Sequence, residues 1–234
     1  MTQKPSKTEF ASNVMLAAAL ADDVANALRT AIARDGKASL LLSGGSTPKL
    51  FFQHLSRQDL DWSNVMVTLV DERWVPPSSD RSNAKLVGEN LLQGLASKAS
   101  FQPLYVDGKN ADEGIPDLDQ VFAQWPQQNT VVILGMGADG HTASFFPGGD
   151  NLSKAIDPET DARFSSMRAA GAGEERITFT LPALLNTQFL ALHIEGETKA
   201  DVLETAMGDG PIEDLPIRSA LRQNRTPLNI YWCP

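Results

Sequence analysis

The segment Val131–Pro147 reads VVILGMGADGHTASFFP, and the rest of the chain is interpreted outward from it. It opens with four apolar residues, three of them β-branched, which is typical of a strand buried on both faces. Three glycines follow, so the backbone is expected to turn tightly, and Asp139 and His141 stand at the end of this turn. In an open α/β sheet, ligands bind beyond the carboxyl ends of the strands. We therefore expect Asp139 and His141 to lie where the chemistry is done.

The composition is that of an ordinary globular protein. The 234 residues are 42% apolar and 21% charged, which is compatible with one α/β domain over residues 1–234 that buries a full core. The net charge of −9 and the lack of a basic run argue against nucleic acid or an anionic membrane as a partner. The one cysteine, Cys233, cannot form an internal disulfide, which fits a reducing, cytoplasmic location.

Neither a metal nor a membrane segment is expected. The sequence has no CxxC pair and no Cys/His spacing typical of a metal site. The polar stretch over residues 1–7 is not followed by the apolar run of a signal peptide, and no segment has the length and apolarity of a transmembrane helix. The expected partner is a small molecule, and the chain is expected to be a monomer or a small homo-oligomer.

Apolar runs and helical spacings alternate along the chain. Strands are predicted over residues 38–42, 64–70, 101–106, 131–134, 163–168, 175–181 (half-buried), 188–195 and 228–232. Helices are predicted over residues 10–33, 49–55, 83–95 and 118–125. Another helix is predicted to follow the stretch 196–199 and to end at Met207, and shorter helices begin at 182 and 216. Residues 148–162 are predicted to form a loop or lid, and the stretch 169–173 is predicted to be flexible. This alternation predicts an α/β fold, with a three-layer, Rossmann-like, mostly parallel sheet flanked by helices.

The segment Ser43–Pro48, SGGSTP, follows the predicted strand 38–42 and precedes a predicted helix. Thr47 is expected to cap that helix, with Pro48 at its first position. A strand, a Gly/Ser loop and a helix N-terminus together gather backbone N–H groups around an anion. The spacing is not that of a Walker loop. The segment therefore indicates a phosphate site, and the alternative is a capped turn that binds nothing.

The glycines of Gly135–Gly140 also satisfy the pattern G-x-G-x-x-G, which would indicate a dinucleotide. The context does not fit, because Pro147 and the two glycines after it break any helix within two turns. No second apolar strand follows before the polar loop, as a Rossmann unit requires. The pattern is therefore not interpreted as a nicotinamide or flavin site, and no cofactor is expected.

His141 is the strongest candidate for a general base. It stands in a glycine turn, and imidazole gains and loses its proton near neutral pH. Asp139, two residues earlier, is expected to orient the ring; the alternative is that both residues cap a following helix. His54 is interpreted as a packing or surface residue and His193 as a satisfied residue of a strand. Because no Ser or Cys stands in a nucleophile-elbow pattern, we expect proton transfer or base-assisted attack by water, without a covalent intermediate.

Basic side chains stand close to predicted strand ends, although the chain as a whole is acidic. Arg73 follows the strand 64–70 within Asp71-Glu-Arg, Arg176 opens another strand, and Lys199 precedes a helix. Guanidinium groups suit phosphate through paired hydrogen bonds. We therefore expect a phosphorylated substrate, and the alternative for Asp71 and Arg73 is a local salt bridge at the mouth of a loop.

Five motifs in this order resemble the glucosamine-6-phosphate isomerase/6-phosphogluconolactonase family, on its 6-phosphogluconolactonase branch. They are SGGSTP at Ser43–Pro48, DERWV at Asp71–Val75, GMGADGHTAS at Gly135–Ser144, ERITFTLP at Glu175–Pro182 and GETKA at Gly196–Ala200. The resemblance implies the fold of the ribose-5-phosphate isomerase/glucosamine-6-phosphate deaminase superfamily. It implies hydrolysis of 6-phospho-D-glucono-1,5-lactone to 6-phospho-D-gluconate in the oxidative pentose phosphate pathway, without a metal. The implied catalytic residues are His141 and Asp139, and the implied substrate-binding residues are Ser43, Gly44, Gly45, Ser46, Thr47, Asp71, Arg73, Arg176 and Lys199.

The sequence after the catalytic turn separates the two branches of the resemblance. The deaminases typically continue His-Ile-Ala-Phe-Asn-Glu-Pro, whereas this chain reads HTASFFP, so Phe146 stands where they carry a ring-opening Glu. Arg73 stands where they tend to carry Tyr. The stretch 171–173 is less proline-rich than is typical of the family. Three alternatives stay open: a sugar-phosphate isomerase or deaminase, a sugar-phosphate sensor without turnover, and a dinucleotide enzyme.

Overall fold

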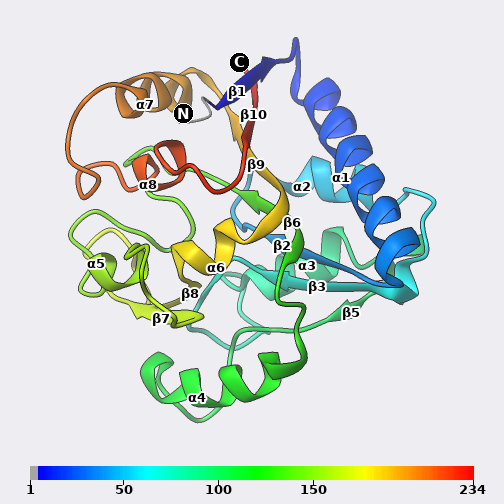
Figure 1. The fold of residues 1–234 in the computed structure, drawn as a ribbon, viewed down its shortest axis with the longest axis horizontal. Helices are drawn as coiled ribbons and strands as arrows, with labels where there is room; N and C mark the ends of the chain where they lie inside the picture. Colours follow the sequence, from blue (N-terminus) through cyan, green and yellow to red (C-terminus); the bar gives the residue numbers. More distant parts are fainter. Residues whose placement is uncertain (1–4) are drawn as a thin grey trace.

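The computed structural model describes residues 5–234, and its centre is a seven-stranded, all-parallel sheet (Figure 1). The strands lie in the order β1, β10, β9, β6, β2, β3, β5. Their bounds are β1 Ser6–Glu9, β2 Ala38–Leu42, β3 Val65–Leu69, β5 Ser100–Phe101, β6 Asn129–Leu134, β9 Thr187–Glu195 and β10 Leu228–Cys233. The predicted α/β class with a mostly parallel sheet is confirmed. Residues 1–4, part of the polar stretch in which no signal peptide was expected, lie outside the described residues.

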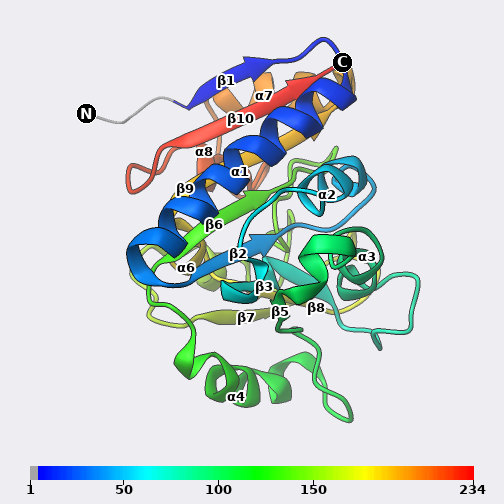
Figure 2. The ribbon, with the colours of Figure 1, turned by 90° about the vertical axis from the view of Figure 1, so that its right-hand side faces the viewer.

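Helices cover both faces of this sheet, as a three-layer architecture requires. Figures 1 and 2 show α1 and α2 on one face and α7 and α8 on the other. The helices are α1 Asn13–Asp35, α2 Lys49–Leu55, α3 Asn83–Asn90, α4 Ala111–Val121, α5 Leu152–Ala155, α6 Leu181–Leu185, α7 Glu197–Met207 and α8 Arg218–Leu221. Short 3₁₀ turns occupy Trp62–Asn64, Gly94–Lys98 and Phe122–Gln124. Among residues 5–234, none of these helices has the length and apolar character needed to cross a bilayer.

A second, three-stranded antiparallel sheet lies beside the first. Its strands are β4 Asp71–Arg73, β8 Arg176–Phe179 and β7 Phe164–Met167, in the order β4, β8, β7. The backbone of Val70 joins the two sheets, because its N–H donates to Leu42 in the large sheet and its carbonyl accepts from Phe179 in the small one. The sequence did not predict this second sheet, and β8 is buried along its whole length, so the expectation of a half-buried strand was wrong.

Three predicted elements also differ in extent. The strand predicted over 101–106 ends at Phe101, since Pro103 has no N–H to extend the ladder. The helix predicted over 118–125 begins at Ala111, where Asn110 and Glu113 form a capping box, and ends at Val121. The helix predicted over 83–95 ends at Asn90.

The order of the strands fixes where a ligand can bind. After β2 the chain moves outward to β3 on one side, whereas β6 lies on the other side of β2. The carboxyl ends of β2 and β6 therefore form the topological switch point, where open α/β sheets bind their ligands. Both strands are buried along their full length, so the loops that follow them start from a rigid base.

Candidate active site

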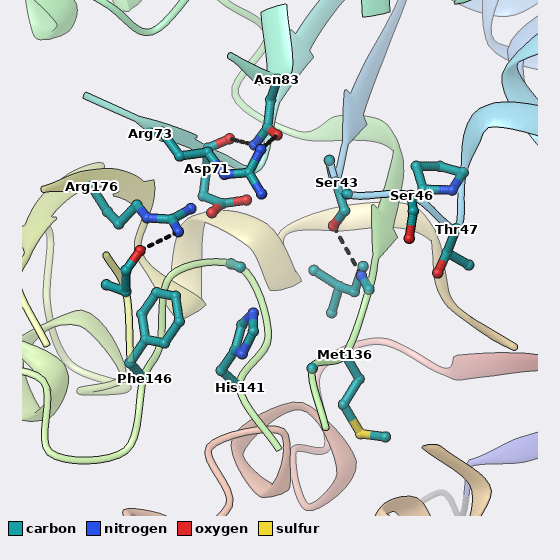
Figure 3. A pocket seen from close by; sticks show the side chains of 18 of the residues that line it. Ser43, Ser46, Thr47, Asp71, Arg73, Asn83, Met136, His141, Phe146 and Arg176 are labelled. Carbon is teal, nitrogen blue, oxygen red and sulfur yellow. Dashed lines mark hydrogen bonds between the residues drawn. The ribbon is translucent and has the colours of Figure 1, made fainter. Parts of the chain in front are cut away.

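A cavity of about 350 Å³ opens at the carboxyl ends of β2 and β6 (Figure 3). His141 lines it, and so do all nine of the predicted substrate-binding residues. Asp139 is not part of the lining, although it contacts His141. Residues from both sheets thus surround one cavity. Their placement agrees with the sequence-based set, while their roles stay predictions.

Ser43 joins the two loops at the switch point. Its hydroxyl donates to the carbonyl of Ile133 over 2.9 Å and accepts from the N–H of Gly135, also over 2.9 Å. Figure 3 shows one of these two hydrogen bonds as a dashed line from Ser43. Both contacts are made within the protein, so the hydroxyl of Ser43 fixes the loop after β2 to the loop after β6. The residue supports the cavity whether or not it also contacts a substrate.

The loop after Ser43 presents its backbone to the cavity. Within residues 5–234, the N–H groups of Gly44, Gly45, Ser46 and Thr47 find no protein acceptor. Gly45 has a φ of +92°, a conformation that L side chains rarely adopt. Successive unpartnered N–H groups in such a loop form a concavity suited to an anion.

The loop ends differently from the prediction. Pro48, not Thr47, is the N-cap of α2, and its carbonyl accepts from the N–H of Phe52. The Thr47 hydroxyl instead accepts a hydrogen bond from Lys199 Nζ over 3.1 Å. Burial lowers the pKa of Lys199 below its ordinary value, against the opposing pull of the Glu195 carboxylate. Thr47 therefore holds the ammonium group of Lys199 at the end of the loop Ser43–Thr47.

The turn after β6 holds His141 by its Nδ1 atom. This atom lies 2.5 Å from Asp139 Oδ1, and the same carboxylate oxygen accepts from the backbone N–H of His141. Burial alone would raise the pKa of Asp139, but the hydrogen bond and charge of His141 outweigh it, so the pKa lies below the ordinary value. Because Nδ1 is engaged by an ionised carboxylate, Nε2 is the nitrogen left to exchange a proton.

No helix follows this turn, so the alternative in which Asp139 and His141 cap one is wrong. The chain makes a short turn instead, in which the N–H of Phe145 donates to the carbonyl of Thr142. Ala143 between them has a φ of +48°, which is uncommon for a residue other than glycine. The absence of a helix here also removes the N-terminus on which a dinucleotide pyrophosphate would sit, in keeping with the rejection of that pattern.

Two glycines of the turn are required by close packing. A Cβ atom on Gly137 would lie 2.2 Å from the His141 ring and 2.5 Å from Asp139 Oδ1. Gly140 has a φ of +75°, and a Cβ there would lie 2.5 Å from Leu215. The carbonyl of Gly140 accepts from the N–H of Ile217, which ties the turn to the segment before α8.

The opposite wall of the cavity comes from the small sheet and is cationic. Arg176 is only 6% exposed, and its Nη2 donates to the carbonyl of Ala172 over 2.6 Å. Its guanidinium lies over the ring of Phe146, which also stacks against His141. Burial lowers the pKa of Arg176, while the nearby Asp71 carboxylate raises it. Phe146 thus packs against both the candidate base and a candidate phosphate ligand.

Asp71 and Arg73 contact different partners, so the predicted local salt bridge does not form. Asp71 Oδ2 accepts from the buried hydroxyl of Ser144 over 2.6 Å. Arg73 Nη1 donates to Asn83 Oδ1 and to the carbonyl of Arg81. In the described part of the chain, no carboxylate lies within ion-pair distance of Arg73.

Unpartnered buried side-chain atoms gather at this cavity. Within residues 5–234 they are Arg73 Nε, Arg176 Nε and His193 Nδ1, and all three residues line the cavity. Leaving such a group without a partner costs about 1–3 kcal/mol, which is typical of functional sites rather than of a folding core. His193 was predicted to be a satisfied residue of a strand; its Nε2 contacts Glu195 Oε1, but its Nδ1 has no partner, so that interpretation was half wrong.

Sequence reasoning missed two other polar side chains of the lining, Arg81 and Asn83. Neither stands next to a glycine motif or a predicted strand end. The one available signal was the start of the predicted helix at residue 83. The Ser82 hydroxyl caps this helix by accepting from the N–H of Lys85. That cap places Asn83 at the first helical position, directly beside the cavity.

Comparison with known proteins agrees with this geometry. The family model of glucosamine-6-phosphate isomerases/6-phosphogluconolactonase matches residues 11–232. A 6-phosphogluconolactonase of Rhizobium meliloti (strain 1021) is 52% identical over 225 residues, which cover 96% of this chain and 97% of that protein. The crystal structure of a 6-phosphogluconolactonase from Shewanella baltica OS155 superimposes with a TM-score of 0.96 at 38% identity, over 100% of both chains.

A monomeric glucosamine-6-phosphate deaminase is also similar in structure. It has a TM-score of 0.75 at 17% identity, over 96% of this chain and 97% of that one, which shows a shared fold alone. Together with the near-complete family match, these likenesses identify the chain: it belongs to the glucosamine-6-phosphate isomerase/6-phosphogluconolactonase family.

Proposed function

We propose that this enzyme hydrolyses 6-phospho-D-glucono-1,5-lactone to 6-phospho-D-gluconate, the second step of the oxidative pentose phosphate pathway. The observation that carries the proposal is one cavity with two parts. One part is a histidine oriented by a carboxylate, and the other is a set of cationic side chains and unpartnered backbone N–H groups. Relatives named 6-phosphogluconolactonase cover nearly the whole chain and support the same reaction.

The phosphate group of the substrate docks on the loop Ser43–Thr47. Lys199 stands at the end of this loop, and Arg176 and Arg73 supply guanidinium groups from the opposite wall. These three side chains and the loop N–H groups provide the charge-assisted hydrogen bonds that a phosphate dianion prefers. They make the site locally positive in a protein whose net charge is −9.

The lactone carbonyl is attacked by a water molecule that loses a proton to His141 Nε2. The tetrahedral intermediate carries its negative charge on the former carbonyl oxygen. Backbone N–H groups of a glycine turn stabilise that charge, typically by about 3 kcal/mol for each donor. The bond to the ring oxygen then breaks, His141 returns the proton to that oxygen, and the products are a carboxylic acid and an open-chain hydroxyl.

Asp139 keeps the ring of His141 in the tautomer that leaves Nε2 unprotonated and ready to accept a proton. The scheme requires neither a covalent intermediate nor a metal ion. Amine release by a deaminase reaction is less well supported, because the sequence position of the deaminases' ring-opening Glu is occupied here by Phe146, whose buried ring stacks against His141.

The test is hydrolysis of freshly generated 6-phospho-D-glucono-1,5-lactone, compared with the uncatalysed background. We expect wild-type protein to accelerate it and His141→Ala to lose about 10²–10⁴-fold in kcat, the usual range for a general base. The variant should still bind 6-phosphogluconate. Folded wild-type protein without acceleration would refute the lactonase, and release of ammonia from glucosamine 6-phosphate would then be assayed.

A further inference from the structure

One carboxylate beside the cavity has no part in the reaction scheme. Glu72 stands between Asp71 and Arg73 in β4, but its side chain is fully buried and turns away from the cavity toward α3. Its two oxygens accept four hydrogen bonds, from the backbone N–H groups of Arg73, Asn83 and Ala84 and from the hydroxyl of Ser82. Glu72 therefore fixes the first turn of α3 to the strand that carries Arg73.

Asn83, the first residue of α3, contacts three parts of the site. Its Oδ1 accepts from Arg73 Nη1 over 2.7 Å, and its Nδ2 donates to the backbone carbonyl of Asp71 over 3.0 Å. Its side chain also lies against Gly44, where a Cβ atom would come within 1.8 Å of Asn83 Oδ1. Asn83 is 2% exposed, so these contacts are shielded from water.

The contacts leave one side of the Arg73 guanidinium available. Nη1 donates to Asn83 and to the carbonyl of Arg81, while Nη2 and Nε find no protein acceptor within residues 5–234. The guanidinium is planar, so the hydrogen bonds of Nη1 also fix the directions of Nη2 and Nε. Two N–H groups fixed side by side can donate to two oxygens of one phosphate. Figure 3 shows Asn83 directly above Arg73 and Asp71 at the upper side of the cavity.

We propose that Asn83 is a positioning residue for substrate binding: it holds the guanidinium of Arg73 toward the phosphorylated ligand, and Glu72 holds Asn83. Asn83 acts through Arg73 and does not itself touch the reacting atoms. Its removal therefore weakens substrate binding more than it slows the chemical step. The expected change in KM rests on the proposed lactonase function, whereas the expected change in the Kd of a phosphorylated ligand does not.

The test is a double-mutant cycle between Asn83→Leu and Arg73→Ala. Leucine branches at the same atom as asparagine, so it keeps the packing on Gly44 and removes both hydrogen bonds. We expect Asn83→Leu alone to raise KM about tenfold with kcat within about twofold, because hydrogen bonds to charged groups are worth about that factor. In the Arg73→Ala background the same change should raise KM by less than about twofold, since residues that act as a unit are not additive.

Asn129→Leu is the matched control. Asn129 is also buried, accepts from Trp125 Nε1 and donates to the carbonyl of Ala183, but it lies at the start of β6, away from the cavity. It should lower the melting temperature and leave KM unchanged. A KM increase of the same size in this control would attribute the effect to general loosening and overturn the proposal. If Asn83→Leu does not fold, Asn83→Ser, which is too short to reach Arg73, takes its place.

The same cycle is measured on the Kd of 6-phosphogluconate, or of inorganic phosphate if that ligand does not bind. If Asn83→Leu raises Kd by the same factor with and without Arg73, the proposed role of Asn83 is wrong, while the proposed lactonase function is unaffected. If the wild-type protein does not hydrolyse the lactone but the two substitutions have non-additive effects on Kd, the proposed function is refuted and the role of Asn83 is supported. Failure of wild-type protein to bind either ligand would overturn both.

Discussion

The two sheets contribute different chemistry to the same cavity. The large parallel sheet ends in loops that offer backbone N–H groups and His141, and its central strands β2 and β6 are buried throughout. The small antiparallel sheet offers charged side chains, Asp71 and Arg73 from β4 and Arg176 from β8. The large sheet therefore fixes geometry through close packing, and the small sheet provides charge through partly unpartnered polar atoms.

This difference predicts which kinetic constant changes when residues from each sheet are substituted. On the large sheet a small steric change should slow the chemical step, because the catalytic turn has no room to adjust. On the small sheet a loss of hydrogen-bonding geometry should weaken binding while the chemical step continues. The four predictions below test this division, and they run from the largest expected effect to the smallest.

Gly137→Ala should have the largest effect. The added methyl would lie 2.2 Å from the ring of His141, so the ring or the turn must move. A displacement of about 1 Å in a catalytic group can cost about 100-fold, and we expect kcat to fall by that order with little change in the Kd of 6-phosphogluconate. Gly88→Ala in α3 is the control, because nothing lies within 4 Å of its Cβ position. It should add about 0.5–1 kcal/mol of stability without a kinetic effect. If Gly137→Ala keeps the wild-type kcat, the turn can accommodate the methyl group and the prediction is wrong.

Arg176→Lys should mainly raise KM. Lysine keeps the charge but lacks the planar fork that contacts Ala172 and lies over Phe146. We expect KM to rise about tenfold or more and kcat to stay within a few-fold, measured by steady-state hydrolysis of the lactone. Arg163→Lys is a matched control, since Arg163 donates to the carbonyl of Phe122 and lies outside the cavity. A fall in kcat with unchanged KM would assign Arg176 to the chemical step and break the proposed division.

Ser144→Ala tests the contact between the two halves. Ser144 follows the catalytic turn, and its hydroxyl donates to Asp71, so removing it leaves a carboxylate that is 6% exposed short of a partner. A hydrogen bond to a charged group is worth about 1.5–3 kcal/mol, and we expect a stability loss of this order in urea unfolding, with KM raised a few-fold. Ser97→Ala, at an exposed hydroxyl that donates to the carbonyl of Gly94, should change stability by less than about 0.5 kcal/mol. Equal losses of stability in Ser144→Ala and Ser97→Ala would mean that the hydrogen bond from Ser144 to Asp71 contributes little to stability.

The large sheet could be predicted because its signals are local. Mostly apolar runs identified β2 and β6, and α1, which is capped by Gly36 with a φ of +74°, ends close to the predicted end of the helix 10–33. The glycine turn after β6 followed from residue spacing alone. Each of these features depends on neighbours within a few positions of the chain.

Strands over 163–168 and 175–181 were predicted and contain β7 and β8, but β4 and the pairing of the small sheet were not, because β4 is short and the pairing is long-range. β4 has only three residues, all charged, and it pairs with a strand about 100 residues later through the register Arg73 to Arg176. Charged residues in sequence resemble a loop, and only the tertiary contacts of Glu72 and Arg176 allow them to be buried. Asn83 could not be predicted for a similar reason: its importance comes from contacts with Gly44 and with Arg73, ten residues earlier, which no local sequence pattern connects.

The smallest effect is expected at the edge of the cationic wall, for Glu174→Gln. The carboxylate of Glu174 makes two hydrogen bonds to the guanidinium of Arg81, next to the segment 171–173 that lines the cavity. The hydrogen bond to Arg81 lowers the pKa of Glu174 to about 2, from an ordinary value of 4.5. The side chains of Arg81 and Glu174 are 56% and 28% exposed, so solvent screens the pair and its contribution should stay below about 1 kcal/mol.

The lowered pKa fixes the direction of the pH dependence. A carboxyl group whose pKa is depressed by folding stabilises the folded state above its unfolded pKa, and this contribution is lost as pH falls through the folded pKa. The stability difference between wild type and Glu174→Gln should therefore be constant above about pH 5 and disappear between pH 4.5 and about 2. It should also shrink with added salt, because exposed pairs are screened. If the difference in urea midpoint between wild type and Glu174→Gln does not change with pH, the substitution acts through lost packing and not through lost charge. Glu174 and Arg81 would then hold the segment 171–173 by shape, as the glycine turn after β6 holds His141.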